Sequence, residues 1–314
     1  MNMNPHRIVY VNGHMVAEEE ATISIRDTGF VYGDCVFDSL RTFNGKPFRL
    51  QAHIDRLYQS LEYARIDCGI PPDEMARLTE EVIGLNLPAL RPGEDYWVTQ
   101  RISTGLQQLD GEPRPKAPTV IIECIPLPLR ARAKYFRDGI DVVVPERVRI
   151  PPAALSPNVK SNNYLNMMLA QREVQQDHPG AWALMRDIHG NLAEGAGCNF
   201  FMVSDGVVYT PAREFVLAGV SRQVVIELCE KNGIAIREAD ISIDFALNGQ
   251  EAFLTSTSLC ACPINQLNGH RLSGGAPGPV TGKIMRGFAD LVEFDYVDQY
   301  RSFLGDDTEG STGL

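Results

Sequence analysis

A carboxylate followed by a glycine-rich turn stands out among the residues that could carry chemistry in this 314-residue sequence. Glu194 directly precedes Gly195-Ala196-Gly197, and an apolar run follows. Glycine lets a backbone approach a ligand closely, so this carboxylate could serve a planar, cationic heterocycle. Lys160 lies 194 − 160 = 34 residues earlier, which leaves room for a helix and a strand. A lysine able to form a Schiff base and an acid able to hold a pyridinium nitrogen are what pyridoxal phosphate chemistry requires.

The setting of Lys160 separates it from an ordinary surface lysine, which is what most lysines are. The flanking Pro157-Asn158 and Ser161-Asn162-Asn163 are poor residues for a helix interior. We therefore expect Lys160 at a strand end or in a loop, where functional groups commonly lie. Schiff-base formation needs the neutral amine, which desolvation favours, so we also expect Lys160 to be buried.

Three further segments offer groups that could bind a phosphate. Gly219-Val220-Ser221-Arg222 leads into an expected helix, whose first N–H groups and dipole attract anions. Ser256 and Thr257 follow an apolar strand and carry hydroxyl donors. Arg56 lies on an expected helix and could grip a phosphate bidentately. Each segment also has a structural interpretation: a capped helix, a polar strand end, or a surface ion pair of Arg56 with a neighbouring acid.

The first half of the chain is typical of antiparallel strands followed by helices. Asn12-Gly13 and Asn44-Gly45 favour the left-handed dihedrals of tight hairpin turns. Apolar residues recur at helical spacing from Leu50, and Pro71-Pro72-Asp73 marks a second helix start. The expected strands cover residues 8–11, 14–16, 36–43, 47–50, 96–103 and 119–125, with an exposed loop at 105–118. Asp34, Asp38 and Arg41 could line a pocket or belong to a structural network.

The second half mixes short strands with helices. The expected strands are 141–145, 181–186, 200–203, 207–210 and 252–256; the expected helices are 163–175, 221–232 and 281–291. Ser221 can cap the helix over 221–232, and Gly233 can end it. Residues from 306 onward are predicted to be disordered. These patterns predict an N-terminal domain at 1–127, a connection at 128–138 and a C-terminal domain at 139–314.

Composition and charge limit the classes of function. The hydrophobic content of 44% and charged content of 22% are typical of a globular protein. The net charge of −11 argues against nucleic-acid and membrane partners, although a local basic pocket can still hold a phosphate. The N-terminus lacks the apolar run of a signal peptide, so we expect a cytoplasmic location. None of the seven cysteines forms a CxxC pair, so we expect buried free thiols and no metal site.

Taken together, the segments Lys160–Tyr164, Glu194–Asn199 and Gly219–Arg222 resemble the class IV aminotransferases, the fold type IV pyridoxal phosphate enzymes. That family includes branched-chain amino acid aminotransferases, D-amino acid aminotransferases, (R)-selective amine transaminases and aminodeoxychorismate lyases. The resemblance extends over nearly the whole chain, with its motifs in the family's order. It implies a mixed α/β and α+β fold, with a small α+β N-terminal domain and a barrel-like C-terminal domain, and a homodimer.

The resemblance also implies a role for each matching residue. Lys160 would be the catalytic residue, bonded to pyridoxal 5'-phosphate and moving a proton between substrate and cofactor. Glu194 would keep the pyridine nitrogen protonated, Tyr164 would hydrogen-bond the phenolic oxygen, and Leu217 would pack against the ring. The phosphate would be held by Arg56, Val220, Ser221, Ser256 and Thr257.

The candidate substrate pocket matches the branched-chain type only in part. Asp38 and Ser39 stand where that type has glutamate and glycine, and Thr99 stands where it has an arginine that binds the substrate carboxylate. Arg101 is two positions further and would face the same side of a regular strand. It could trap the carboxylate as in D-amino acid aminotransferases, or lie outside the pocket. The candidate substrate residues are Tyr32, Phe37, Ser39, Arg41, Thr99, Arg101 and Ser258.

The reaction implied is transamination from an amino donor to a 2-oxo acid acceptor, ahead of a lyase reaction on the same cofactor. The donor could be a branched-chain-like L-amino acid, a D-amino acid or an (R)-amine. Retention of Tyr32, Phe37 and Arg41 favours the first. A binding protein that kept the scaffold without the cofactor is the alternative from another class, and it does not explain the presence of Lys160 and Glu194 together.

Overall fold

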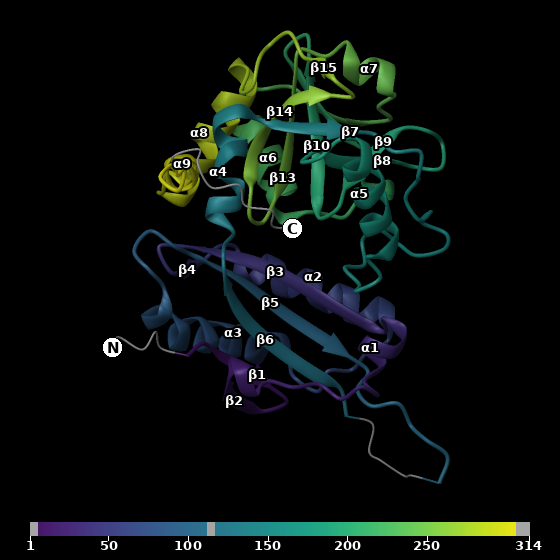
Figure 1. Cartoon of the computed structure of the whole chain (residues 1–314), viewed down its shortest axis with the longest axis vertical. Coiled ribbons are helices and arrows are strands. Elements are labelled where there is room, and N and C mark those ends of the chain that lie inside the picture. The colour runs from purple at the N-terminus through teal and green to yellow at the C-terminus, as the bar shows by residue number, and fades with distance from the viewer. Residues whose placement is uncertain (1–5, 112–116, 306–314) are drawn as a thin grey trace. The chain divides into compact units, whose positions relative to one another are not determined.

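The computed structural model describes residues 6–111 and 117–305, and it divides the chain into two compact units. Unit 1 comprises Met1–Leu127 and Val159–Asn163, and unit 2 comprises Pro128–Asn158 and Tyr164–Leu314. Figure 1 shows both units with their elements labelled. The tip of the predicted loop, at 112–116, and the predicted disordered tail from 306 lie outside the described residues.

Unit 1 is built on a six-stranded antiparallel sheet in the order β2-β1-β6-β5-β3-β4. Its strands are β1 (Ile8–Val11), β2 (His14–Ala17), β3 (Cys35–Phe43), β4 (Lys46–Pro47), β5 (Tyr96–Ser103) and β6 (Thr119–Pro126). Both residues of Asn12-Gly13 and of Asn44-Gly45 have positive φ, so the two predicted hairpins are confirmed. The second hairpin has a shorter return strand than expected, because the chain turns into a helix at Leu50.

Two helices, α2 (Leu50–Ala64) and α3 (Pro72–Asn86), cover one face of this sheet (Figure 1). Alternate strand residues, among them Val36, Leu40, Val98 and Ile122, pack against the helices in a buried core. Because side chains alternate across a strand, the residues between them point to the opposite face. Two short helical segments, η1 (Glu18–Glu20) and η2 (Leu87–Ala89), and the five-residue α1 (Thr28–Tyr32) complete the unit.

The segment Val159–Asn163 joins unit 1 by pairing with the first half of β3. Phe37 donates its backbone N–H to the Lys160 carbonyl at 2.9 Å, and Asn162 donates to the Cys35 carbonyl at 2.9 Å. Ser161 forms an antiparallel bridge with Val36. Lys160 therefore lies in an extended segment beside a strand, as its flanking residues predict.

Unit 2 contains a closed sheet. Strand β9 pairs with β8 on one side and β10 on the other, so β10, β13, β14, β7, β8 and β9 form a ring. This closure confirms the predicted barrel-like sheet. The strands of unit 2 are β7 (Ile140–Val143), β8 (Trp182–Arg186), β9 (Leu192–Gly195), β10 (Cys198–Ser204), β11 (Val207–Pro211), β12 (Ile236–Ala239), β13 (Glu251–Ser256), β14 (Cys260–Leu267) and β15 (His270–Arg271).

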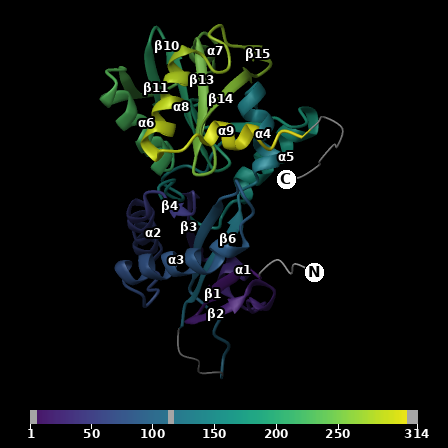
Figure 2. The same cartoon turned by 90° about the vertical axis from the view of Figure 1, so that its left-hand side faces the viewer.

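Helices pack around the barrel of unit 2 (Figure 2). They are α4 (Leu129–Asp138), α5 (Leu165–Asp177), α6 (Val220–Lys231), α7 (Ile243–Leu247), α8 (Pro279–Val292) and α9 (Tyr296–Arg301), with η3 at Arg213–Phe215. Helix α6 lies against α8 and β13, and α4 lies against α9 and β14. The residues expected to connect the domains thus form α4. The prediction that Ser221 caps α6 is wrong: Gly219 is the N-cap, and no side chain caps this end.

All seven cysteines are buried and free, which confirms the predicted thiols. Burial raises the pKa of Cys198 to about 12, so this thiol stays protonated beside Glu194. Within residues 6–111 and 117–305, no helix is long and apolar enough to cross a membrane.

Candidate functional site

In unit 2, Glu194 is a buried carboxylate that accepts hydrogen bonds from Arg149, Leu217 and Asn199. It lies on β9 with an exposed fraction of 3%. Its Oε1 accepts a hydrogen bond from Arg149 Nη2 at 2.7 Å. Its Oε2 accepts from the Leu217 backbone N–H at 3.0 Å and from Asn199 Nδ2 at 3.3 Å. These donors fix the orientation of the carboxylate and favour its charged form.

The turn that follows Glu194 is tight for two reasons. Gly197 has a φ of +84°, which favours glycine. At Gly195 a Cβ atom would lie 2.7 Å from Cys198 Sγ and 2.8 Å from the Ala183 carbonyl oxygen. The glycines noticed in the sequence therefore allow β9 to turn directly into β10.

The N-terminus of α6 is the candidate anion site of unit 2. The first N–H groups of a helix have no partner within the helix, and the N-cap residue here, Gly219, has no side chain to cap them. A Cβ atom on Gly219 would lie 2.1 Å from Asn199 Oδ1, so glycine allows the chain to pass Asn199 closely. Asn199 also donates Nδ2 to the Leu217 carbonyl at 3.0 Å. Asn199 thereby ties Glu194 to the segment that begins α6.

The hydroxyl residues after β13 form a turn with internal contacts. Ser256 Oγ accepts from the Leu259 backbone N–H at 3.1 Å. Ser258 is only 2% exposed; Arg132 donates to its hydroxyl, and Tyr300 donates to its carbonyl at 2.6 Å. The Ser258 side chain thus anchors this turn within unit 2. Tyr164 is half-buried at the residue before α5.

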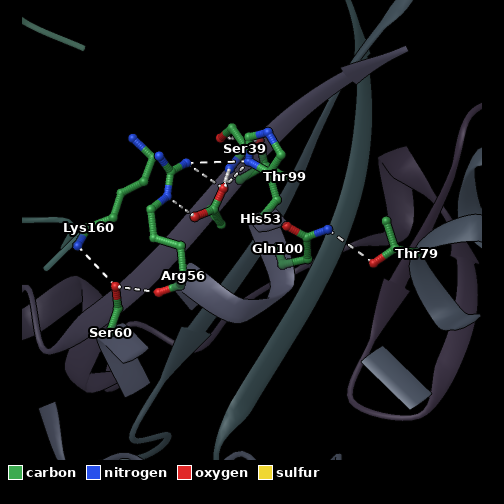
Figure 3. A network of polar contacts seen from close by, with 9 residues as sticks. Ser39, His53, Arg56, Ser60, Thr79, Thr99, Gln100 and Lys160 are labelled. Atoms are coloured by element: carbon green, nitrogen blue, oxygen red, sulfur yellow. Dashed lines mark hydrogen bonds and ion pairs between the residues drawn. The ribbon is translucent and has the colours of Figure 1, made fainter. Parts of the chain in front are cut away.

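In unit 1, Arg56 belongs to a buried network with Asp38 and His53 (Figure 3). Arg56 donates Nε to Asp38 Oδ2 at 2.7 Å and Nη2 to Asp38 Oδ1 at 2.8 Å. His53 Nδ1 lies 2.7 Å from Asp38 Oδ1, and Ser39 donates its backbone N–H to the same oxygen at 2.7 Å. The suggestion of a surface ion pair for Arg56 is therefore wrong, since its partner is a carboxylate on β3.

Burial and charge act in opposite directions on this network. Burial would raise the pKa of Asp38, but the charge of Arg56 and the contacts with His53 outweigh it and hold the pKa well below its usual range. For His53, burial is the largest influence and lowers the pKa; the attraction of Asp38 opposes it, and Arg56 and Lys160 add to the lowering. Asp38 is therefore charged, and His53 favours its neutral form.

Lys160 is connected to the same helix through Ser60. The Lys160 backbone N–H donates to Ser60 Oγ at 3.1 Å, and Ser60 donates to the Arg56 carbonyl at 3.0 Å (Figure 3). Lys160 Nζ lies 4.4 Å from the centre of the Phe37 ring. The side chain is half-buried, so the expectation that Lys160 is buried is only partly met in this chain.

Five of the candidate substrate residues, Phe37, Ser39, Arg41, Thr99 and Arg101, lie on the sheet face opposite α2 and α3. Ser39 and Thr99 face each other across β3 and β5, with their hydroxyls 3.0 Å apart. Arg101 Cζ lies 5.8 Å from the Phe37 ring, and Arg101 donates to Glu123 Oε1 at 2.9 Å. The amine of Lys160 contacts Phe37 on this face, so these groups share one surface of unit 1.

Two candidates of unit 1 contact residues outside this set. Arg41 is 1% exposed, stacks over Phe43 at 4.0 Å and donates to the Thr42 carbonyl at 3.1 Å. Tyr32, on α1, is 61% exposed and accepts a hydrogen bond from Gln107 at 2.8 Å. Sequence analysis missed Arg149 and Asn199 as partners of Glu194. Asn199 ends the glycine motif and could have been noticed there, whereas nothing in the sequence pairs Arg149 with Glu194.

Comparison with known proteins identifies the relatives of this chain. A family model described as amino-transferase class IV matches residues 35–267. A putative branched-chain-amino-acid aminotransferase of Methanocaldococcus jannaschii is 33% identical over 286 residues, covering 90% of this chain and 96% of the relative. A D-alanine aminotransferase of Listeria monocytogenes is 31% identical over 290 residues, with the same coverage. The branched-chain amino acid aminotransferase of Thermobaculum terrenum in its PLP form superposes with a TM-score of 0.80 at 25% identity, covering 96% of this chain and 99% of that one.

Proposed function

The chain belongs to the class IV aminotransferases, and we propose that it uses pyridoxal 5'-phosphate to move an amino group from a branched-chain-like L-amino acid to a 2-oxo acid. The observation that carries this proposal is the held carboxylate of Glu194 beside the glycine turn, together with Lys160 in the matching motif. When bound, the cofactor supplies an electron sink for the substrate carbon.

The donor set of unit 2 fits a phosphorylated pyridine. Glu194 would hold the protonated ring nitrogen, and Leu217 would pack on the ring. The uncapped N–H groups of Val220 and Ser221 suit the phosphate, because a helix N-terminus favours anions. Ser256 and Thr257 would add hydroxyl donors. Tyr164 would donate to the phenolic oxygen.

We assign the proton-moving role to the amine of Lys160. Its backbone is fixed on both sides, through Ser60 and through the pairing with β3, so the side chain projects from a rigid position. The neighbouring Arg56, which is oriented by Asp38, would contribute to phosphate binding. A positioned amine of this kind can abstract and return a proton at the substrate carbon.

For the substrate, we propose that Phe37, Ser39, Thr99 and Arg101 contribute to the pocket wall. Support comes from their shared face with Lys160 and from the similarity to a branched-chain enzyme. A D-amino acid is the second candidate donor, because the chain is also similar to a D-alanine aminotransferase and carries Arg101 on that face. Arg101 is paired with Glu123. A substrate carboxylate would have to compete with Glu123 for it.

We further propose a cytoplasmic homodimer whose protomers have the two domains 1–127 and 139–314, except that Val159–Asn163 joins the first. Large apolar side chains gather on the surface of unit 1 around α1: Ile23, Ile25, Phe30 and Val31 are 42% to 81% exposed. Exposed apolar groups of this extent favour contact with another chain. Size-exclusion chromatography with light scattering tests the dimer, and a monomer at micromolar concentration would contradict it.

The central test is a half-reaction. We expect the purified protein to bind pyridoxal phosphate, become yellow, and lose that colour on adding an amino donor. The variant Lys160→Ala should lose turnover entirely, whereas Lys283→Ala, at an exposed site, should match the unaltered protein. A Lys160→Ala protein with near-normal turnover would overturn the assignment. A panel of L-amino acids, D-amino acids and both enantiomers of 1-phenylethylamine then identifies the donor.

A further inference from the structure

A buried arginine pairs with Glu194, and none of the roles assigned above uses it. The Arg149 side chain is 11% exposed, and its Nη2 donates to Glu194 Oε1 at 2.7 Å. Its Nε atom is buried and has no hydrogen-bond partner in the described part of the chain. The guanidinium is thus oriented toward Glu194, although this leaves one of its own donors unsatisfied.

The backbone places Arg149 beside Glu194 through the barrel sheet. Arg149 donates its N–H to the Arg186 carbonyl at 2.8 Å, and Val148 forms a parallel bridge with Arg186 at the end of β8. Strand β9, which carries Glu194, is the next strand beyond β8. The irregular segment after β7 therefore runs beside β8 and places the Arg149 guanidinium next to the Glu194 carboxylate.

Stability alone does not account for this ion pair. Burying two charges costs desolvation, and apolar replacements of buried pairs are often neutral or stabilising. Arg149 brings a charge to Glu194, whereas the Leu217 N–H and Asn199 Nδ2 donors are neutral. A nearby opposite charge favours the ionised form of a buried acid, which would otherwise tend to take up a proton.

We propose that Arg149 is a positioning residue that keeps Glu194 anionic, so that the proton shared by Glu194 and a pyridine nitrogen stays on the nitrogen. This inference rests on the proposed function. Without the guanidinium, the N–H bond of the pyridinium would break, and its proton would form an O–H bond on Glu194. The anion and the pyridinium would then become a neutral acid and a neutral ring, and the ring would withdraw electrons less strongly.

A first experiment uses the cofactor-free chain and separates charge from packing. Arg149→Met removes the charge and keeps most of the length, Arg149→Lys keeps the charge, and Arg147→Gln removes an exposed arginine paired with Glu173 as a control. We expect the Tm of Arg149→Met to fall below that of the unaltered chain at about pH 8 and to recover toward it at about pH 5.5. Recovery follows because the uncompensated carboxylate can take up a proton as the pH falls.

The double variant Arg149→Met/Glu194→Gln extends this experiment. This double variant has no carboxylate whose charge needs a partner. Its Tm should therefore not recover between about pH 8 and about pH 5.5, and the effects of the two substitutions on Tm should be non-additive. A Tm deficit of Arg149→Met that is the same at both pH values, or that persists unchanged in the double variant, would mean that Arg149 only packs the segment and would overturn the proposal.

A second experiment uses the protein loaded with pyridoxal phosphate. We expect Arg149→Met to lower kcat by about tenfold to a hundredfold, as loss of a supporting partner typically does. Its cofactor absorption should shift and depend on pH, and Arg149→Lys should restore most of both. Normal kcat and an unaltered spectrum in Arg149→Met would contradict the proposal. If the unaltered chain bound no pyridoxal phosphate, the proposed function itself would fail, and the Tm experiment would still report on the Arg149–Glu194 pair.

Discussion

Two buried carboxylates in this chain are held in different ways. Asp38, in unit 1, accepts from Arg56 twice, from His53 and from a backbone N–H, and it is wholly inaccessible to solvent. Four contacts use the acceptor capacity of a carboxylate. Glu194, in unit 2, is bound by one cation and two neutral donors, beside a glycine turn and near the start of α6.

The proposed function gives the two carboxylates different tasks: Asp38 orients its neighbours, and Glu194 would meet a ligand. Asp38 lies among residues of the unit 1 core, where its contacts fix the guanidinium of Arg56 and the ring of His53. Glu194 lies beside Gly195, and Gly219 lies close to its partner Asn199; a Cβ atom at either glycine would collide with neighbouring atoms. We therefore expect changes at Asp38 to act first on stability and changes at Glu194 to act first on turnover.

Glu194→Gln should give the largest effect on activity. The amide cannot carry the negative charge that holds a pyridinium proton, so kcat should fall by about a hundredfold to ten-thousandfold, or roughly 3–5 kcal/mol of transition-state stabilisation. The Tm should fall less than in Asp38→Ala, because the amide oxygen still accepts one of the hydrogen bonds, although the buried Arg149 cation loses its anion. Steady-state kinetics and thermal unfolding check both statements, with Glu173→Gln as an exposed control. Equal losses of kcat and Tm would remove the distinction between the two carboxylates.

Asp38→Ala should show the opposite pattern. It leaves the Arg56 cation buried without its partner, which typically costs about 3–5 kcal/mol of stability. Urea unfolding should therefore give a clearly lower midpoint, and the affinity for pyridoxal phosphate should also fall if Arg56 holds the phosphate. Asp38→Asn should lose less, since an amide oxygen still accepts from Arg56. A fully stable Asp38→Ala protein would show that the network is not structural.

Local patterns predicted the parts of the fold that local physics determines. The two Asn-Gly turns, the helical spacing from Leu50 and the proline at the start of α3 each depend on neighbours in sequence. Strand β14 was not predicted, because Cys260–Leu267 is largely buried without alternation and contains Pro263 inside a central strand.

The candidate site, too, could be predicted only where neighbours in sequence determine it. The family motifs supplied Lys160 and Glu194, but the partners of the predicted charges depend on sheet pairing. Arg56 pairs with Asp38 from β3, and Glu194 pairs with Arg149 from a segment 45 residues earlier. Strand β9 itself exists through pairing with β8 and β10, so its four residues carry little signal of their own.

The free energy of unfolding should depend on pH, and this dependence distinguishes His53 from Asp38 within the buried network. The expected effect is intermediate in size. Burial lowers the pKa of folded His53 below that of the unfolded chain, near 6.5, so the unfolded state binds more protons as the pH falls below that value. The free energy of unfolding should then decrease by at most about 1.4 kcal/mol per pH unit. The pKa of Asp38 is lowered too, so its contribution is present above about pH 3.9 and is lost only in stronger acid.

His53→Gln should flatten the slope between about pH 6.5 and 5, whereas His270→Gln, at an exposed site, should leave it unchanged. Chemical denaturation across that range measures the slope. An unaltered slope in His53→Gln would assign the dependence to other groups.

Ser60→Ala should have the most local effect, and it tests whether the Asp38 network reaches Lys160. Ser60 is fully buried and joins the Lys160 N–H to the Arg56 carbonyl. The alanine leaves the Lys160 N–H without this acceptor, at a cost of about 1–3 kcal/mol. Hydrogen exchange at the Lys160 amide should accelerate, whereas Ser302→Ala, which removes a similar hydroxyl contact at the end of α9, should not affect it. If exchange at Lys160 is unchanged, the β3 pairing alone positions the lysine, and the network around Asp38 serves only the stability of unit 1.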